Sequence, residues 1–278
     1  MAVWEAESRK MSGELVQGRN MANVWIIGAS SGIGAALAIA LAREGHSVVA
    51  SARRIDLLNQ VAARSPRSGA IIPLPLDVRD RSALEAAAAQ VFSRFGQLDY
   101  CFLNAGKYEL SRSGIDPAVY AEVTRVNYLG VVESLAVVIP RLIHQGSGQI
   151  LVTASVAGYR GLPQAGAYGP TKAALISLCE TLAIELKPLG VAVRVINPGF
   201  IRTPMTAKNR FYMPFLIDAE DAAQRILRAL PGKRFEIAFP WQMILIMKIV
   251  RILPNWLYLR VMAKLAPSPG TFDKPEGA

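Results

Sequence analysis

The 278-residue chain contains little cysteine, has fewer acidic than basic residues and lacks long uncharged apolar runs. Its two cysteines cannot form a disulfide framework, and neither a CxxC pair nor a Cys/His cluster occurs, so we expect a reduced, cytoplasmic protein without a metal site. The absence of an uncharged apolar run of roughly 18 residues argues against a conventional membrane-spanning helix. Lysine and arginine form no long run interleaved with aromatic residues, which argues against a nucleic-acid partner.

What the chain does contain is apolar and basic. Hydrophobic residues make up 52% and charged residues 19% of it, and the mean hydropathy is +0.28, a composition that excludes a disordered chain. The 31 lysines and arginines against 21 acidic residues give a formal net charge of +10, which suits phosphorylated ligands or anionic lipid surfaces. The segment 1–20 has mixed charges and no apolar signal-peptide region, so we expect a flexible extension or sequence upstream of a start at Met11 or Met21.

Short apolar runs alternate with longer segments rich in alanine and leucine. We expect strands at Val24–Ile27, Ser47–Ala50, Ala70–Leu76, Asp99–Leu103, Gln149–Thr153, Val191–Ile196 and Phe235–Ala238. We expect helices at Gly32–Glu44, Ile55–Ala63, Arg81–Phe95, Asp116–Leu142, Tyr168–Leu186 and Asp218–Leu230. This alternation predicts an α/β fold with one doubly wound, Rossmann-like parallel sheet. We assign residues 21–238 to this single domain, 239–266 to an apolar and basic helical tail, and 267–278 to a flexible end.

A glycine-rich loop, Gly-Ala-Ser-Ser-Gly-Ile-Gly, joins the first expected strand to the first expected helix. Glycines allow the backbone to approach a phosphate closely, and a helix N-terminus offers unpaired N–H groups to a pyrophosphate. Such a loop can also simply turn the chain, but a strand before it and a helix after it favour dinucleotide binding. The residues that we expect at the cofactor are Gly28, Ser30, Ser31, Gly32, Ile33 and Gly34.

The end of the second expected strand indicates which dinucleotide binds. An acidic residue there would hydrogen-bond the ribose of NAD, but the place is taken by Ala52, with Arg53 and Arg54 next to it. A guanidinium suits a 2′-phosphate through its charge and its planar donors. The two arginines could instead be solvated residues at the start of a helix. We expect NADP(H), with NAD(H) as the alternative.

Ser155, Tyr168 and Lys172 form the most specific constellation. Ser155 follows a strand end, and Tyr168 and Lys172 are four residues apart, on one face of the expected helix. An ammonium about 4 Å from a phenol contributes about 4 kcal/mol at an effective dielectric of 20, which predicts a tyrosine pKa lowered from near 10 towards 7. Such a tyrosine can transfer a proton near neutral pH. The same spacing also occurs by chance on amphipathic helices.

Two further polar signals follow strands, Asp77-Val78 after the third and Asn104-Ala105-Gly106 after the fourth. Each could be a plain turn or cap on its own. Taken together, the motifs resemble those of the short-chain dehydrogenase/reductase family, in its single-domain branch. They occur in the family's order over residues 23–238: the glycine loop, these two signals, the Ser155 to Lys172 set, and Asn197–Thr203.

The resemblance implies a catalytic tetrad. Asn127, in the segment Arg-Val-Asn-Tyr-Leu-Gly, would join Ser155, Tyr168 and Lys172 and would hold a water that links Lys172 to solvent. Lys172 would also bind the nicotinamide ribose.

The resemblance also implies cofactor contacts. Asp77 and Val78 would contact adenine, and Asn104 would support the loop on the cofactor side. The Ile201 backbone and Thr203 would anchor the nicotinamide and the pyrophosphate. The full set that the resemblance adds to the glycine loop and the arginine pair is Asp77, Val78, Asn104, Ala105, Gly106, Tyr168, Lys172, Pro198, Gly199, Ile201 and Thr203.

The tail Trp241–Ala266 is strongly apolar and is interrupted by basic residues and by Pro254. Lys248 and Arg251 are three residues apart, and Arg260 and Lys264 are four apart, which predicts two short amphipathic helices suited to a membrane interface. The alternatives are a helical cap over the substrate pocket and an oligomer contact that buries the same surface.

The sequence therefore predicts an NADP(H)-dependent oxidoreductase that moves a hydride between nicotinamide and a carbonyl or secondary alcohol. Tyr168 would act as acid and base, and Ser155 would hold the substrate oxygen. An apolar segment would form a lid over an apolar or lipid-like substrate; it contains Met205, Phe211, Tyr212, Met213 and Phe215. The competing function is a non-enzymatic NADP(H) sensor or scaffold on the same fold. We also expect a homo-oligomer, which is common in the family, and a cytoplasmic location with peripheral membrane contact through residues 241–266.

Overall fold

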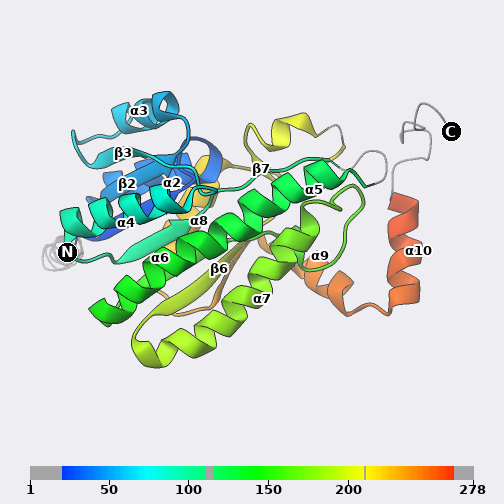
Figure 1. The fold of residues 1–278 in the computed structure, drawn as a ribbon. Coiled ribbons are helices and arrows are strands. Elements are labelled where there is room, and N and C mark those ends of the chain that lie inside the picture. Colours follow the sequence, from blue (N-terminus) through cyan, green and yellow to red (C-terminus); the bar gives the residue numbers. More distant parts are fainter. Residues whose placement is uncertain (1–20, 111–114, 210, 266–278) are drawn as a thin grey trace, which may run out of the picture.

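The computed structural model describes residues 21–110, 115–209 and 211–265. Seven parallel strands form one sheet in the order β3-β2-β1-β4-β5-β6-β9 (Figure 1). The strands are β1 Asn23–Ile27, β2 Ser47–Ala52, β3 Ile71–Pro75, β4 Tyr100–Leu103, β5 Gln149–Thr153, β6 Ala192–Pro198 and β9 Glu236–Phe239. The predicted doubly wound parallel sheet is confirmed, and each strand overlaps its predicted range. The extensions expected at 1–20 and 267–278 lie outside the described residues.

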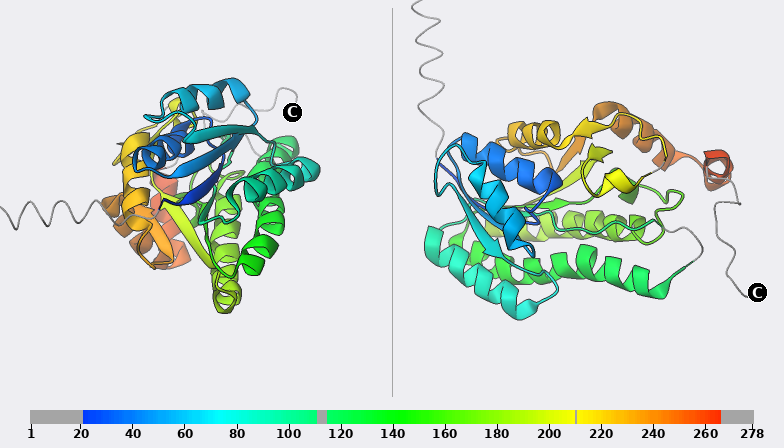
Figure 2. Two further views of the ribbon diagram at one scale, coloured as in Figure 1. Left: turned by 90° about the vertical axis from the view of Figure 1, so that its left-hand side faces the viewer. Right: turned by 90° about the horizontal axis from the view of Figure 1, so that it is seen from above.

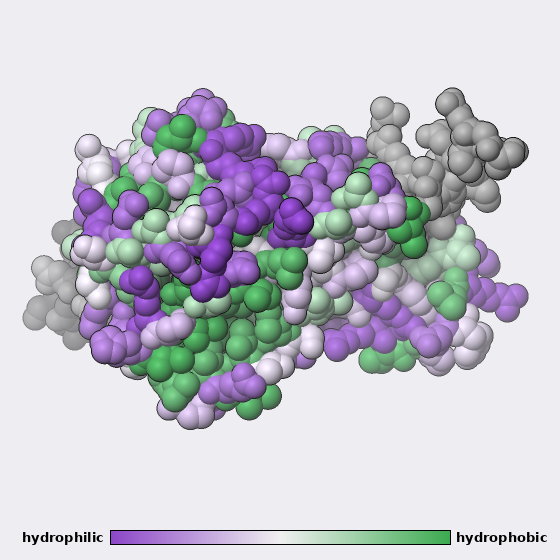
Figure 3. Space-filling model, viewed as in Figure 1, coloured by the Kyte–Doolittle hydropathy of each residue, from purple (hydrophilic) through white to green (hydrophobic). Residues whose placement is uncertain are grey.

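Helices cover both faces of the sheet (Figure 2). Successive residues of a strand point to opposite faces, so Val24 and Ile26 pack in one core and Trp25 and Ile27 in the other. The first core contains residues of α2 Gly32–Arg43, α3 Ile55–Ala63 and α8 Ala219–Ala229. The second contains residues of α4 Arg81–Phe95, α6 Gly130–Gln145 and α7 Gly169–Leu186. Apolar side chains also gather on the outer surface over α6 and α7 (Figure 3).

The helix predicted at Asp116–Leu142 is three segments in the structure. They are α5 Pro117–Thr124, a π-helix Arg125–Leu129, and α6. By length and composition alone, the continuous run Pro117–Gln145 could cross a membrane, although charged residues interrupt its apolar sequence. In the structure Val131, Leu135 and Val138 of this run pack in the second core. We therefore interpret it as a core helix.

Except for a 3-10 helix that precedes β6, the remaining segments lie toward the carboxyl end of the sheet. Two short strands, β7 Ile201–Arg202 and β8 Ile217–Asp218, pair with each other. Five stretches form the remaining helices: the 3-10 helices Val156–Gly158, Lys187–Leu189 and Thr206–Lys208, and the pair α9 Trp241–Ile252 and α10 Asn255–Leu265. The break that the sequence predicts at Pro254 separates α9 from α10, and Met243 and Met247 of α9 belong to the second core.

Candidate active site

A cavity of about 490 Å³ lies where the strands of the sheet end. Parallel sheets bind ligands at this edge, because the loops that follow several strands converge there. Most of the residues predicted to touch cofactor or substrate line the cavity: Gly28, Ser30, Ser31, Gly32, Ile33, Arg53, Arg54, Asp77, Val78, Asn104, Ala105, Gly106, Ser155, Tyr168, Lys172, Pro198, Gly199, Ile201 and Thr203. Gly34 and Asn127 are not among the lining residues.

The glycine loop is compact because two of its glycines leave no room for a side chain. Gly28 has φ +98°, and a Cβ there would lie 2.4 Å from the backbone nitrogen of Ala105. A Cβ on Gly34 would lie 2.2 Å from the Gly28 carbonyl oxygen and 2.7 Å from Asn104 Nδ2. Gly34 therefore acts from beneath the cavity, where it lets the N-terminus of α2 pack closely on the loop.

Asn104 connects this loop to the strands beside it. Its Nδ2 donates to the Gly28 carbonyl oxygen at 2.9 Å, and its Oδ1 accepts from Thr153 Oγ1 at 3.0 Å. The ends of β1, β4 and β5 are thus held together by one amide side chain. The supporting role expected of Asn104 agrees with these contacts, whereas Thr153 was not singled out from the sequence.

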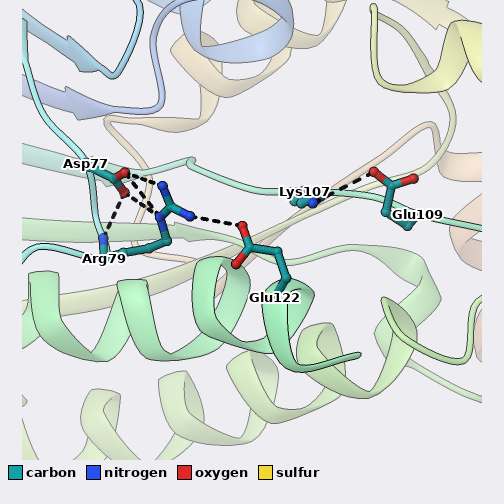
Figure 4. Close-up of polar contacts among 5 residues, drawn as sticks. All are labelled: Asp77, Arg79, Lys107, Glu109 and Glu122. Atoms are coloured by element: carbon teal, nitrogen blue, oxygen red, sulfur yellow. Dashed lines mark hydrogen bonds and ion pairs between the residues drawn. The ribbon is translucent and has the colours of Figure 1, made fainter. Parts of the chain in front are cut away.

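Basic and acidic side chains cluster around the end of β2. Arg54 Nη2 donates to Ser30 Oγ at 3.3 Å, and both arginines after β2 line the cavity. Asp77 and Arg79 form an ion pair of 2.7 Å, and Arg79 also contacts Glu122 of α5 at 3.2 Å (Figure 4). The hydrogen bond from Arg79, with smaller contributions from its charge and that of Arg53, holds the pKa of the Asp77 carboxyl below its usual value. Arg79 and Glu122 carried no motif that could identify them in the sequence.

Ser155, Tyr168 and Lys172 meet at the end of β5. Ser155 is buried at the start of a 3-10 helix, where its Oγ accepts from the Ala157 N–H at 3.1 Å. Tyr168 directly precedes α7, and Lys172 lies one turn further along. The Lys172 Nζ donates to the Thr153 carbonyl oxygen at 2.8 Å and lies 5.5 Å from the centre of the Tyr168 ring.

The predicted lowering of the Tyr168 pKa is wrong for this structure. Burial raises the pKa of Tyr168 to about 12, and the interaction with Ser155 opposes this only in part. Burial also lowers the pKa of Lys172 to about 8. The prediction assumes a full charge beside the phenol, but the Lys172 ammonium is directed at the Thr153 carbonyl oxygen, and burial favours the neutral form of Lys172.

Residues 22–212, which contain these motifs, match a family model described as short chain dehydrogenase. The chain belongs to the short-chain dehydrogenase family. An uncharacterized oxidoreductase of Myxococcus xanthus is 32% identical over 244 residues, which cover 84% of this chain and 93% of that protein.

Solved structures of short-chain dehydrogenases show the same fold. One from Burkholderia cenocepacia in complex with NADP has a TM-score of 0.74 and 26% identity, over 87% of this chain and 98% of that one. Another from Burkholderia phymatum in complex with NAD has a TM-score of 0.75 and 25% identity, over 82% of this chain and 92% of that one. The chain is therefore an NAD(P)-dependent oxidoreductase of this family, which acts on CH–OH or C=O groups of a small molecule.

Asn127 occupies the π-helix and is fully buried. Its Oδ1 accepts from the Lys107 N–H at 2.7 Å, and its Nδ2 donates to the Lys107 carbonyl oxygen at 2.9 Å and to Thr171 Oγ1 at 3.2 Å. These bonds hold the segment after β4 against the N-terminal turn of α7. The water that the family resemblance places at Asn127 stays a prediction.

The segment that Asn127 holds contributes cavity residues that the sequence did not indicate. Lys107, Tyr108 and Glu109 all line the cavity, and Lys107 Nζ lies 4.0 Å from the Glu109 carboxylate (Figure 4). The Tyr108 ring meets the Tyr168 ring edge-on, with 5.1 Å between centres. Their position directly after the Asn-Ala-Gly motif was the signal that could have identified them.

The predicted lid is only partly at the cavity. Of its five apolar residues, Met205 lines the cavity, whereas the Tyr212 side chain is 86% exposed. Phe211 packs edge-on against Phe200 at 5.8 Å. Within residues 21–110, 115–209 and 211–265, no group of three or more His, Cys, Asp or Glu side chains could hold a metal ion.

Proposed function

We propose that this short-chain dehydrogenase transfers a hydride between NADP(H) and an apolar carbonyl compound or the corresponding secondary alcohol. The observation that carries the proposal is the meeting of Ser155, Tyr168 and Lys172 in one cavity with the glycine loop. Binding a nucleotide does not require a serine and a tyrosine hydroxyl beside a buried lysine, so the set favours an enzyme over a sensor or scaffold. The bound nicotinamide supplies or accepts the hydride.

Tyr168 is the proton donor in the reducing direction. With a pKa of about 12, its phenol is protonated throughout the neutral range. Together with the Ser155 hydroxyl it polarises the carbonyl by hydrogen bonding and then transfers its proton to the oxygen that becomes the alcohol. Lys172 Nζ lies 5.5 Å from the centre of the Tyr168 ring and is held by the Thr153 carbonyl oxygen, a position from which it would bind the ribose of the nicotinamide.

A preference for NADP(H) is supported by the side chains after β2. Ala52 stands where a carboxylate would bind the ribose of NAD, and Arg53 and Arg54 line the same part of the cavity. The contact between Arg54 and Ser30 holds one guanidinium over the phosphate-binding loop. A 2′-phosphate there would receive charge-assisted hydrogen bonds.

An apolar substrate is supported by large apolar side chains at and beside the cavity. Tyr108 and Met205 line the cavity, and Phe200 and Phe211 pack together on the segment that continues from it. Large apolar side chains that surround a reacting carbonyl exclude water from hydride transfer.

A homo-oligomer is also part of the proposal. It is supported by the apolar surface over α6 and α7 (Figure 3) and by two exposed side chains, one in the π-helix directly before α6 and one near the end of α7. Leu129 is 48% and Ile184 is 75% exposed. An extended apolar surface on helices is typical of a protein–protein contact.

Replacing Tyr168 by Phe tests the reaction. NADPH oxidation against a panel of acyl, steroid and small carbonyl compounds should fall at least about a hundredfold, because the phenolic proton is lost while the ring remains. NADPH binding, followed by its fluorescence, should be retained. Tyr100→Phe, at the amino end of β4, is the matched control and should keep wild-type turnover. Turnover by Tyr168→Phe with the substrate of the wild type would exclude the mechanism.

A further inference from the structure

Large apolar side chains on one side of α9 and α10 remain exposed, because no other described part of the chain covers them. We call this surface the C-terminal apolar face. On α9 its members recur every three or four residues and so share one side of the helix. The face consists of Trp241, Leu245, Ile249 and Ile252 on α9 and Trp256, Leu259 and Val261 on α10, which are between 38% and 80% exposed.

The surroundings of this face are basic. From residue 237 to 265 the sequence contains Lys248, Arg251, Arg260 and Lys264 and no aspartate or glutamate. Lys248 donates to Glu236 at 2.9 Å, whereas none of the other three forms an ion pair with a residue that the structure describes. The face therefore combines apolar area with uncompensated positive charge.

One arginine fixes the face to the catalytic domain. Arg160, five residues after Ser155, donates from Nη1 to the carbonyl oxygens of Val250 and Leu253, each at 2.7 Å. Its Nη2 donates to Asn255 Oδ1 at 2.7 Å, and its guanidinium lies 3.9 Å from the centre of the Tyr258 ring. The turn between the two helices is thus held by the same segment that carries the catalytic serine.

The face does not cover the cavity. Met243, on the opposite side of α9, packs against Gly199, where a Cβ would lie 3.2 Å from Met243 Cγ. None of the residues that line the cavity belongs to α9 or α10. α9 thus packs against the turn at Gly199, which follows β6, and α10 projects at one end of the molecule (Figures 1 and 2). This removes the pocket cap from the alternatives that the sequence left open.

We propose that the C-terminal apolar face binds the interface of an anionic lipid bilayer. Tryptophans near the start of each helix, aliphatic residues on the same side and flanking arginine and lysine are the composition of an interfacial helix, in which basic residues contact lipid phosphates. A second copy of the chain fits less well, because a symmetric contact would place the two basic surfaces against each other. Lipid binding here would bring the cavity, through Arg160, to the surface where apolar carbonyl compounds accumulate.

Vesicle co-sedimentation of the full chain tests the proposal. Wild type should bind vesicles of phosphatidylcholine with phosphatidylserine at least about tenfold more tightly than vesicles of phosphatidylcholine alone. Arg260→Gln with Lys264→Gln should weaken binding to the anionic vesicles on the order of thirtyfold, from a factor of about five for each basic residue. Ile252→Glu with Leu259→Glu should reduce binding to background, because it places carboxylates at the two sites that enter the bilayer.

Controls separate this result from unfolding and from loss of activity. Ile252 is 80% and Leu259 is 64% exposed, so replacing them removes little packing, and the variants should melt within a few degrees of wild type. Leu189→Glu, at a site 46% exposed in the turn after α7, introduces the same carboxylate elsewhere and should leave vesicle binding unchanged. NADPH turnover with a water-miscible substrate should be the same in all of them, so a failure of the proposed reaction would be seen separately.

Two results would overturn the proposal. One is equal binding of wild type and Ile252→Glu with Leu259→Glu to anionic vesicles. The other combines two observations: wild type does not bind vesicles, and light scattering shows an oligomer that dissociates in this double variant. That result would assign the face to a contact with a second copy of the chain.

Discussion

At the scale of single residues, we propose that a few charges after β2 decide between the two dinucleotides. Arg54 is held at Ser30 by a 3.3 Å hydrogen bond, which places its guanidinium beside the phosphate loop. Arg54→Ala should weaken NADPH binding about tenfold to a hundredfold, the value of one charge-assisted hydrogen bond. NADH binding should change less than about threefold. Fluorescence titration measures both, with Arg94→Ala on α4 as the control; an equal loss for the two nucleotides would refute the assignment.

Lys172 makes stability depend on pH with a defined sign. Burial lowers the pKa of Lys172 to about 8 from 10.5, so between these values the unfolded chain binds more protons than the folded one. Stability should therefore rise as the pH increases from 8 towards 10.5, and below pH 8 the charged ammonium destabilises the fold. Lys172→Met removes this titration.

The measurement for Lys172 is urea unfolding at several values from about pH 7 to about pH 10. The free energy of unfolding of Lys172→Met, relative to wild type, should decrease by about 2 kcal/mol across that range. Lys187→Met, in the turn after α7, should show a constant difference. A constant difference for Lys172→Met as well would mean that the ammonium does not titrate there.

At the scale of elements, arginines donate hydrogen bonds to the carbonyl oxygens at the C-terminal ends of helices. These carbonyls have no partner within their own helix. Arg194 of β6 is only 3% exposed. It donates to the carbonyl oxygens of Ala229 and Leu230 at the end of α8, at 2.9 and 3.2 Å, and to that of Arg234 at 2.8 Å. Burial lowers the pKa of Arg194, but the three carbonyls compensate the desolvation of its guanidinium.

Arg194→Met should destabilise the chain by about 2–4 kcal/mol, because three carbonyl groups lose their donor while the volume of the side chain is nearly kept. Denaturant unfolding measures this loss. Arg228→Met, on the exposed side of α8, should change stability by no more than about 0.5 kcal/mol. If the two variants were equally stable, the hydrogen bonds of Arg194 to the end of α8 would contribute nothing to the free energy of unfolding.

The elements also show where pattern reasoning succeeded and failed. The strands follow from apolar runs whose residues are buried on both faces, so their positions could be predicted to within a few residues. The π-helix at Arg125–Leu129 could not, because its apolar pattern is the same as that of an α-helix. It is stabilised instead by the bonds of Asn127 to Lys107 and Thr171, which join segments distant in sequence.

At the scale of the whole molecule, the apolar surface over α6 and α7 predicts association of the chain with itself. Light scattering at micromolar concentration should give a mass at least twice that of the 30.1 kDa chain. Ile184→Glu should reduce this mass, because it introduces charge into the proposed contact at a site 75% exposed. Ile252→Glu on α9 should not. A wild-type monomer would exclude the assembly.

The motifs of the site could be predicted because each depends on neighbours in the chain. The Gly28 to Gly34 loop, the arginine pair and the Tyr168 and Lys172 spacing are local, and the structure brings nearly all of them to one cavity. The tertiary structure decided what these residues experience there. Burial, which no spacing reports, reverses the expected shift of the Tyr168 pKa.

The sequence by itself determined the sheet, the family and the identity of the groups around the cavity, because strand patterns and motifs act over short stretches of chain. Only the tertiary structure decided the ionisation of Tyr168 and Lys172, the contribution of Tyr108, and the side of α9 that stays open to solvent. These depend on desolvation and on contacts such as those of Arg160 with Val250 and Leu253, ninety residues or more away. Such long-range contacts leave no periodic signal in a sequence.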